Sequence, residues 1–312
     1  MKTFLFLIST LGLSALGLAG ATYAAAPAAH PIEVALTFDD LPVHGKLPPH
    51  MNRFDVMEKI LTTLKKNDQH DVFGFINAST IAGISDREEA LRLWAKEQRL
   101  ANHTFSHPDL AGTTSTKYLA DMLLNEPFLK KFSLPGQDWK WFRYPFLGEG
   151  DSLAKRNFVR KGLKDNGYRI AEVTTDFSDW SWNSPYSRCM AQGDSDGVAE
   201  LKESYLHAAV SRLHYADQMS QLVFGRSIPQ ILLMHVGAFD AEMLDDMMAA
   251  YRAEGVTFVT LEQAASDPAY AQDPGFASAD AETFLSQWMK VKKLPFPAVD
   301  KIPAGQLSKT CL

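Results

Sequence analysis

Two adjacent carboxylates follow an apolar run near the start of the chain. The run covers residues 32–38, and Asp39 and Asp40 come directly after it. Two histidines, His103 and His107, occur later in the sequence "NHTFSH". Two imidazoles and one carboxylate can bind a divalent metal and leave positions open for water and substrate. We therefore predict that Asp40 joins the two histidines as a metal ligand and that Asp39 accepts a proton from the activated water.

Three more polar residues stand where apolar segments end or loops begin. Arg143 follows an aromatic segment, and an ion pair with it would hold the base Asp39 in place and ionised. His235 closes the apolar run "ILLM" and would act as a general acid if a carboxylate such as Asp179 oriented it. Each feature also has an ordinary alternative: a surface arginine, a core histidine and a solvated acidic turn.

An apolar pocket beside these residues is expected from strand geometry. Leu233 precedes His235 by two positions, so both side chains point to the same face of a strand. Leu233 and Trp180 would then line a pocket for a small acyl group, with ordinary core packing as the alternative.

The polar residues must be brought together by the elements that precede them. Segments typical of strands alternate along the chain with segments of helical apolar spacing. The expected strands lie at 32–38, 72–77, 100–102, 139–145, 168–175, 229–237 and 256–260, and the expected helices at 54–66, 85–98, 115–126, 151–167, 198–224 and 240–255. This alternation predicts an α/β fold of six to seven parallel strands, in an open sheet or a barrel. The carboxyl ends of parallel strands share one face, which is where such folds carry their active sites.

The two ends of the chain are expected to lie outside the catalytic domain. Residues 1–26 have one early cation, an apolar run and then small residues, as a secretory signal peptide does; a membrane anchor is the alternative. We place the catalytic domain at 27–265 and an extension packed on it at 266–312. Export to the periplasm or the medium would favour a disulfide between Cys189 and Cys311 over two free thiols. The net charge of -6 does not favour a nucleic-acid groove.

Five short motifs resemble those of a known family. "TFDD", "HTFSH", "RYP", "DFSDW" and "LLMH" occur in the order and approximate spacing of the polysaccharide deacetylases, the NodB-homology carbohydrate esterases, over roughly residues 32–262. The resemblance implies a distorted (β/α) barrel and a divalent metal, usually Zn²⁺ and sometimes Co²⁺ or Ni²⁺. It also implies hydrolysis of N- or O-acetyl groups on a glycan substrate.

The resemblance assigns the same roles as the residues themselves suggest. It makes Asp39 the base tethered by Arg143, His235 the acid tuned by Asp179, and Trp180 and Leu233 the acetyl pocket. The metal ligands would be Asp40, His103 and His107.

Two departures from the family pattern bear on the substrate. The usual "TFDDG" is "TFDDLP" here, so we expect Leu41, Pro42 and His44 at the rim of the site. The usual Pro-Tyr-Gly is "PFLGEG", which leaves a backbone amide near Tyr144 and Phe146 as the expected oxyanion donor. His44 as a fourth metal ligand is a less favoured alternative.

Other functions are compatible with the same residues. Relatives of this fold hydrolyse small cyclic amides and imides. Two histidines and a carboxylate also suit a non-haem iron enzyme. A catalytically inactive glycan-binding protein is the fourth interpretation.

Overall fold

Parallel strands form the centre of the structure, a computed structural model that describes residues 31–312. The predicted signal peptide lies outside this range. Within it, the sheet has the strand order β5-β4-β3-β2-β1-β6, and β7 pairs with the first residues of β1. All pairings are parallel, as the alternation of strands and helices predicted. The strands are β1 (Glu33–His44), β2 (Phe73–Ile76), β3 (Arg99–Asn102), β4 (Trp141–Phe142), β5 (Arg169–Ile170), β6 (Gln230–Gly237) and β7 (Thr257–Val259).

The two edges of this strand order meet, so the sheet curls into the predicted distorted barrel. The chain beyond β5 stays extended and joins β6 through a parallel bridge between Thr175 and Leu232. The backbone N–H of Leu233 donates to the carbonyl of Thr175 at 3.0 Å, and that of Thr174 to Ile231 at 3.1 Å. Strands β4 and β5 are shorter than the expected ranges 139–145 and 168–175. Most residues of those ranges do not form the regular backbone pairing with a neighbouring strand.

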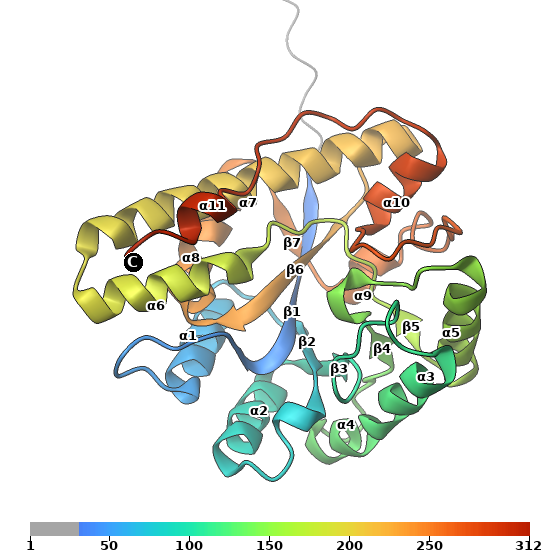
Figure 1. The fold of residues 1–312 in the computed structure, drawn as a ribbon, viewed down its shortest axis with the longest axis horizontal. Coiled ribbons are helices and arrows are strands. Elements are labelled where there is room, and N and C mark those ends of the chain that lie inside the picture. The colour runs from blue at the N-terminus through green and yellow to red at the C-terminus, as the bar shows by residue number, and fades with distance from the viewer. Residues whose placement is uncertain (1–30) are drawn as a thin grey trace, which may run out of the picture. The chain divides into compact units, whose positions relative to one another are not determined.

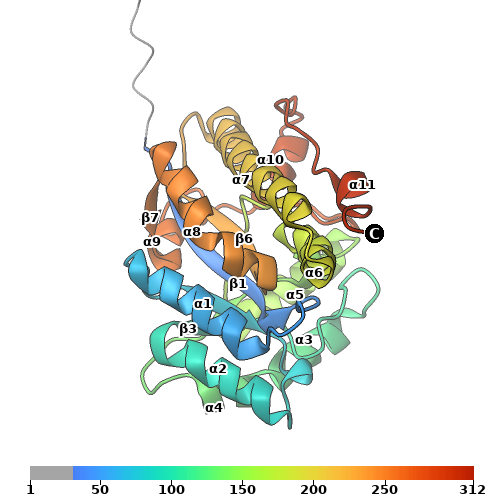
Figure 2. The same cartoon turned by 90° about the vertical axis from the view of Figure 1, so that its left-hand side faces the viewer.

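Helices cover the outside of the strands (Figure 1). In Figure 2, α1 lies between α2 and α8 on one side of the sheet, in agreement with the contacts among these helices. The helices of the described residues are α1 (Arg53–Lys66), α2 (Ser85–Glu97), α3 (Ser115–Leu124), α4 (Glu126–Phe132), α5 (Leu153–Asp165), α6 (Asn183–Gln192), α7 (Ser195–Phe224), α8 (Ala238–Ala253), α9 (Leu261–Ala265), α10 (Phe284–Val291) and α11 (Ala304–Leu307). None of the helices between residues 31 and 312 combines the length and the apolar character needed to cross a membrane.

The helix expected at 115–126 is followed at once by another, α4. Pro127 lies in the first turn of α4, where a missing N–H interrupts no hydrogen bond of the helix. We predicted no helix over α6, α9, α10 or α11, which were too short or too weakly periodic to recognise. Ser152 caps α5, since its side chain accepts from the backbone N–H of Lys155.

The alternating side chains of β1 separate the core from the barrel interior. Val34, Leu36 and Phe38 belong to the main hydrophobic cluster beneath the helices. Ala35 belongs to a second cluster with aromatic and small residues of the neighbouring strands. Thr37, two positions further on, is buried and shares an arginine partner with Asp39. The inward face of β1 therefore leads from apolar packing to the functional groups at its carboxyl end.

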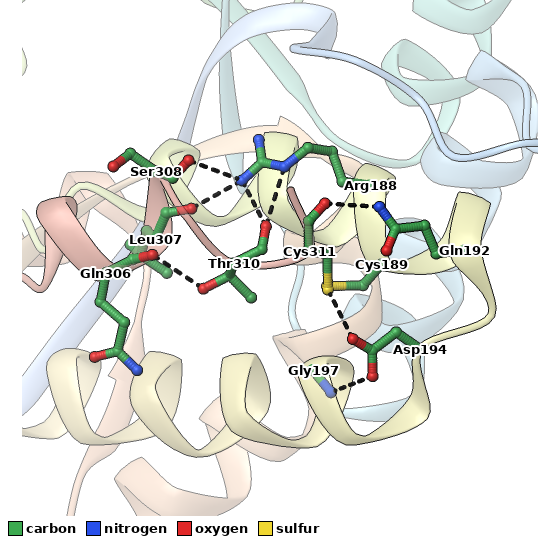
Figure 3. Close-up of a disulfide and its surroundings, with 10 residues drawn as sticks. All are labelled: Arg188, Cys189, Gln192, Asp194, Gly197, Gln306, Leu307, Ser308, Thr310 and Cys311. Atoms are coloured by element: carbon green, nitrogen blue, oxygen red, sulfur yellow. Dashed lines mark hydrogen bonds between the residues drawn. A yellow bond between two sulfur atoms is a disulfide. The ribbon is translucent and has the colours of Figure 1, made fainter.

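The C-terminal segment is attached to the domain at two places. Helix α10 packs against α7 and buries Phe284, Leu285 and Met289. Further on, Cys311 forms a disulfide with Cys189 of α6 (Figure 3), which confirms the predicted pairing.

Candidate metal and acid–base site

The backbone of β1 changes direction at Asp40, which brings both aspartates to one site. On a regular strand, Asp39 and Asp40 would point to opposite faces. Asp40 instead has a left-handed φ of 59°, and the pairing of β1 with β2 shifts register between Phe38 and Leu41. Aspartate adopts this conformation more readily than most residues. This turn lies within the strand, because β1 continues to His44, beyond the expected end at residue 38.

Asp40, His103 and His107 converge in a way that fits a single cation. Oδ1 of Asp40 lies 3.8 Å from Nε2 of His103 and 3.6 Å from Nε2 of His107. Ligands bound at about 2.0–2.2 Å around a tetrahedral ion are about 3.3–3.6 Å apart. Both histidines come from the turn after β3 and not from a helix, because Pro108 disfavours a helical conformation at His107.

The two histidines offer unprotonated nitrogens to this point. Nδ1 of His103 donates to the carbonyl oxygen of Arg143 at 2.9 Å, which leaves Nε2 with its lone pair facing Asp40. Burial, reinforced by the neighbouring His103, lowers the pKa of His107 to about 4 despite the nearby aspartates. Neutral imidazoles are the form that binds a metal. The donor set thus suits a divalent metal ion.

Asp39 is held by the buried Arg143. One guanidinium nitrogen of Arg143 donates to Oδ1 of Asp39 and to Oγ1 of Thr37, both at 2.8 Å. The guanidinium also lies over the Phe75 ring, 4.3 Å from its centre. Oδ2 of Asp39 is directed toward His103 at 3.6 Å, beyond hydrogen-bond distance. One oxygen of Asp39 is therefore fixed, and the other faces the candidate metal site.

His235 is oriented by Asp179 through two hydrogen bonds. Its Nδ1 donates to Oδ1 of Asp179 at 2.8 Å, and its backbone N–H donates to Oδ2 at 2.6 Å. Burial alone would lower the pKa of His235. The charge and hydrogen bond of Asp179, together with Asp40 and Asp39, outweigh burial and raise this pKa to about 10. The ring is therefore a cation at neutral pH, the form that a general acid needs.

A further acid, Asp240, lies behind Asp179 and was not predicted from the sequence. Its carboxyl group accepts from the Tyr205 hydroxyl at 2.9 Å and from the Asn183 side-chain amide at 3.2 Å. Burial and the charge of Asp179 raise the pKa of Asp240 well above its ordinary value. A neutral Asp240 can donate a hydrogen bond to Asp179. In the sequence, Asp240 is recognisable only as an acid in the first turn of α8. Acids are common there because they interact favourably with the helix dipole, so this position does not indicate a role in the site.

His44 also faces the site. Its Nδ1 lies 3.0 Å from Oδ2 of Asp40, and its ring centre is 4.7 Å from that of His235. Among the residues that the structure describes, Asp40, His44 and His235 form a second group of converging ligand atoms. This group does not include His103 or His107, so His44 is not placed as a fourth ligand of the ion that they would share.

A pocket of about 480 Å³ joins these side chains to the predicted acyl contacts. Trp180, Leu233, Tyr144 and Phe146 all line it. The polar side chains described above line it as well: Asp39, Asp40, His44, His103, His107 and His235. Phe146 is exposed and meets the His107 ring edge-on, with ring centres 4.4 Å apart. The ring of Tyr144, however, stacks on Tyr118 inside the protein.

The expectation for Leu41 is wrong. Leu41 is fully buried in the main hydrophobic cluster and does not line the pocket. The left-handed turn at Asp40 sends the next side chain into the core, against Gly74, where an added Cβ would lie only 2.4 Å from Leu41. A side chain at position 41 therefore contributes to packing and not to the rim.

Comparisons with known proteins agree with the geometry. The model of the family described as "Polysaccharide deacetylase" matches residues 27–182. The chain is 26% identical over 239 residues to the peptidoglycan-N-acetylglucosamine deacetylase of Bacillus cereus, covering 73% of this chain and 66% of that protein. The matches with this and two further curated relatives, both chitin deacetylases, span 66%, 36% and 54% of the relatives' own lengths.

Solved structures show the same fold at low identity. The chitin deacetylase of Colletotrichum lindemuthianum gives a TM-score of 0.51 at 22% identity, covering 75% of this chain and 89% of that one. A CE4 family pseudoenzyme from Bacillus anthracis gives 0.51 at 16% identity, covering 75% of this chain and 65% of that one. The fold therefore occurs with and without catalytic activity, and function must be argued from the side chains of this site.

Proposed function

This chain belongs to the polysaccharide deacetylase family, and from that premise we propose that it is a metal-dependent hydrolase that removes acetyl groups from a glycan. One observation carries the proposal. The Asp39–Arg143 pair and the His235–Asp179 pair both reach the pocket where Asp40 and the two histidines of "HTFSH" converge. A base, an acid and a set of metal ligands thus surround a single space.

The ligand set supports a divalent metal as the cofactor. Asp40, His103 and His107 would hold the ion, which when bound would lower the pKa of a water and polarise an acyl carbonyl. Two imidazoles and a carboxylate with open positions favour Zn²⁺, and Co²⁺ or Ni²⁺ would suit the same donors.

Proton transfer falls to residues on either side of the ligands. Oδ2 of Asp39 accepts the proton of the attacking water, while Arg143 holds Oδ1. The second ring nitrogen of His235 donates a proton to the leaving nitrogen or oxygen, and Asp179 keeps the ring oriented. Because Asp39 and His235 belong to separate pairs, Asp39 can accept a proton and His235 can donate one in the same turnover.

The remaining pocket residues would position the acetyl group. Leu233 and Trp180 present apolar surface for its methyl, and backbone amides of the Tyr144–Phe146 turn are candidates to donate to the developing oxyanion. Phe146 has a left-handed φ of 58°, which redirects the backbone at this turn. Substrate contact by Phe146 and Trp180 is favoured by their exposure at the pocket mouth.

Acetate release tests the proposal. Metal-stripped protein is reloaded with Zn²⁺, Co²⁺ or Ni²⁺ and incubated with N-acetylated chito-oligosaccharides and O-acetylated xylan. We expect metal-dependent acetate from at least one substrate, a loss of about 10²- to 10⁴-fold in Asp39→Asn, and no loss in Asp246→Asn, an exposed acid of α8.

The same assay separates the alternatives. Ammonia or ring opening from small cyclic imides, without acetate from any glycan, would replace the proposal with a small-amide hydrolase. Glycan binding without turnover under every metal would indicate an inactive binding protein. Oxygen consumption with bound iron would indicate an oxygenase.

We also propose that the protein works in the periplasm or the medium. The Cys189–Cys311 disulfide supports an oxidising compartment, and the first 26 residues have the composition of an export signal. Fractionation of cells that produce the full chain, followed by N-terminal sequencing of the exported protein, tests this. Intact protein retained in the cytoplasm would contradict it.

A further inference from the structure

A second cavity adjoins the candidate active-site pocket. Its volume is about 340 Å³, and Asp176, Ser178 and Ala281 line both cavities. The rest of its wall comes from α7, through residues such as Arg212 and Tyr215, and from the C-terminal segment, through Glu282, Lys290, Phe296 and Ile302. Because the two spaces share wall residues, they lie side by side at Asp176, Ser178 and Ala281.

The polar lining of this second cavity suits a neutral ligand with many hydroxyl groups. Asp176 and Glu282 supply carboxyl groups and Arg212 and Lys290 supply cations, and Glu282 pairs with Lys290, so neither sign dominates. One oxygen of Asp176 accepts the Ser178 N–H at 2.7 Å. Within the described residues, the buried Nε of Arg212 has no hydrogen-bond partner, although another of its nitrogens donates to the Asp300 carbonyl. Such groups can exchange hydrogen bonds with hydroxyls without requiring a charged ligand.

The second cavity also has aromatic lining that can contact the apolar face of a sugar ring. Phe296 lines the cavity and is 43% exposed, so its ring is accessible to a ligand there. The Tyr215 ring faces the same cavity, with the Arg212 guanidinium 5.5 Å from its centre. A pyranose ring has both an apolar face and a hydroxyl edge. Aromatic rings beside balanced polar groups match those two surfaces.

We propose that this second cavity binds the sugar unit next to the one whose acetyl group reacts. The inference rests on the proposed function, because it assumes a glycan in the first pocket. It is not implied by the family match, which ends at residue 182, before α7 and the C-terminal segment that form most of the wall. The C-terminal segment would thus make the enzyme prefer oligosaccharides to single sugars.

Two anchors hold the C-terminal side of this cavity in place. On one side of Phe296, α10 packs against α7. On the other side, the Arg188 guanidinium donates to the carbonyls of Leu307 and Thr310 at 2.9 and 2.8 Å, and the disulfide follows directly (Figure 3). The segment that carries Phe296 and Ile302 is therefore fixed at both ends, which a preformed binding site requires.

Steady-state kinetics with substrates of different length test the proposal. Zinc-loaded wild type, Phe296→Ala and Phe158→Ala are compared on N-acetylglucosamine, its tetramer and 4-nitrophenyl acetate. Phe158 is a phenylalanine on α5 that is 53% exposed and lines neither cavity. We expect Phe296→Ala to raise KM for the tetramer about 3- to 10-fold, with a smaller effect on the monosaccharide and the ester. Phe158→Ala should match wild type on all three.

Binding measurements separate this inference from the proposed function. Calorimetric titration of the tetramer into Asp39→Asn, with and without Phe296→Ala, measures affinity without turnover. A weaker affinity in the Phe296→Ala background supports the second site. Equal affinities, or a KM change that is the same for the tetramer and the ester, would overturn it even if acetate release is confirmed. Absence of acetate from every glycan, with tetramer binding still dependent on Phe296, would overturn the hydrolase and leave the binding site standing.

Discussion

His44 Nδ1 lies 3.0 Å from Oδ2 of Asp40, on the side of the carboxylate away from the two histidines of "HTFSH". Oδ1 of the same carboxylate faces Nε2 of His103 and His107. The carboxylate is therefore contacted at both oxygens. When one oxygen of a carboxylate binds a metal, a hydrogen bond to its other oxygen fixes the orientation of the carboxylate.

The first prediction concerns metal affinity. Replacing His44 with alanine removes the contact to Oδ2, so we expect the affinity for zinc to fall about 10- to 100-fold. A competition titration against a chromophoric chelator measures the change, and His70→Ala, at an exposed histidine that does not line the pocket, is the matched control. Unchanged affinity in His44→Ala would rule out this orienting role. Two ions per wild-type chain, falling to one in His44→Ala, would instead indicate a second cation held with His235.

The second prediction concerns the pH dependence of the reaction. Asp179 is the main reason that the pKa of His235 is raised to about 10 against the effect of burial. A general acid works while it is protonated, so activity should decline as the pH rises through this pKa. Asp179→Asn removes the charge and lowers the pKa, and the descending limb of kcat/KM should therefore move to lower pH. A descending limb that stays in place would show that another group supplies the proton; Asp246→Asn is the control.

The third prediction concerns the protonation of Asp240. A neutral Asp240 donates to Asp179, and an asparagine of the same shape can also donate. We expect Asp240→Asn to keep kcat/KM within about tenfold of wild type. Asp240→Leu leaves the Tyr205 hydroxyl and the Asn183 amide without their acceptor, at a cost of about 1–3 kcal/mol for each buried group. Thermal unfolding and kinetics of both variants test this, and equal damage in the two would mean that Asp240 is charged.

The fourth prediction concerns the disulfide. Cys189 and Cys311 are 122 positions apart, so their bond restricts a long loop of the unfolded chain. Its removal should reduce the free energy of unfolding by about 2–5 kcal/mol. The double variant Cys189→Ser/Cys311→Ser should unfold at lower denaturant concentration than wild type. Reductant should bring wild type to the same midpoint without moving the variant, and a wild-type midpoint insensitive to reductant would refute the prediction.

The sequence was sufficient to predict the residues that stand at strand ends. Parallel strands place their carboxyl ends on one face, so Asp39, His103, Arg143 and His235 could be grouped before any distance was known. Residues whose placement depends on strand register could not be assigned. His44 pairs with Gly237 of β6, and only that pairing brings its ring beside His235.

Other features of the site depend on local backbone geometry or long-range packing. Leu41 was misplaced because alternation along a strand fails at the left-handed Asp40. Asp240 looks like an ordinary acid near the start of a helix, and only the burial of Asp179 beside it gives it a role. The second cavity needs the C-terminal segment to return to α7, a contact that no local pattern in the sequence specifies.

Arg143 contributes to the site through two chemically independent parts. Its guanidinium holds Asp39, and its backbone carbonyl sets the tautomer of His103. Substituting the side chain changes only the first part, because every amino acid supplies a carbonyl. Point mutagenesis of Arg143 will therefore test its contact with Asp39 but not the contact of its carbonyl with His103. A one-residue insertion or deletion between β4 and Pro145 would displace both parts at once, so sequences that differ in length there should not be assumed to share this chemistry.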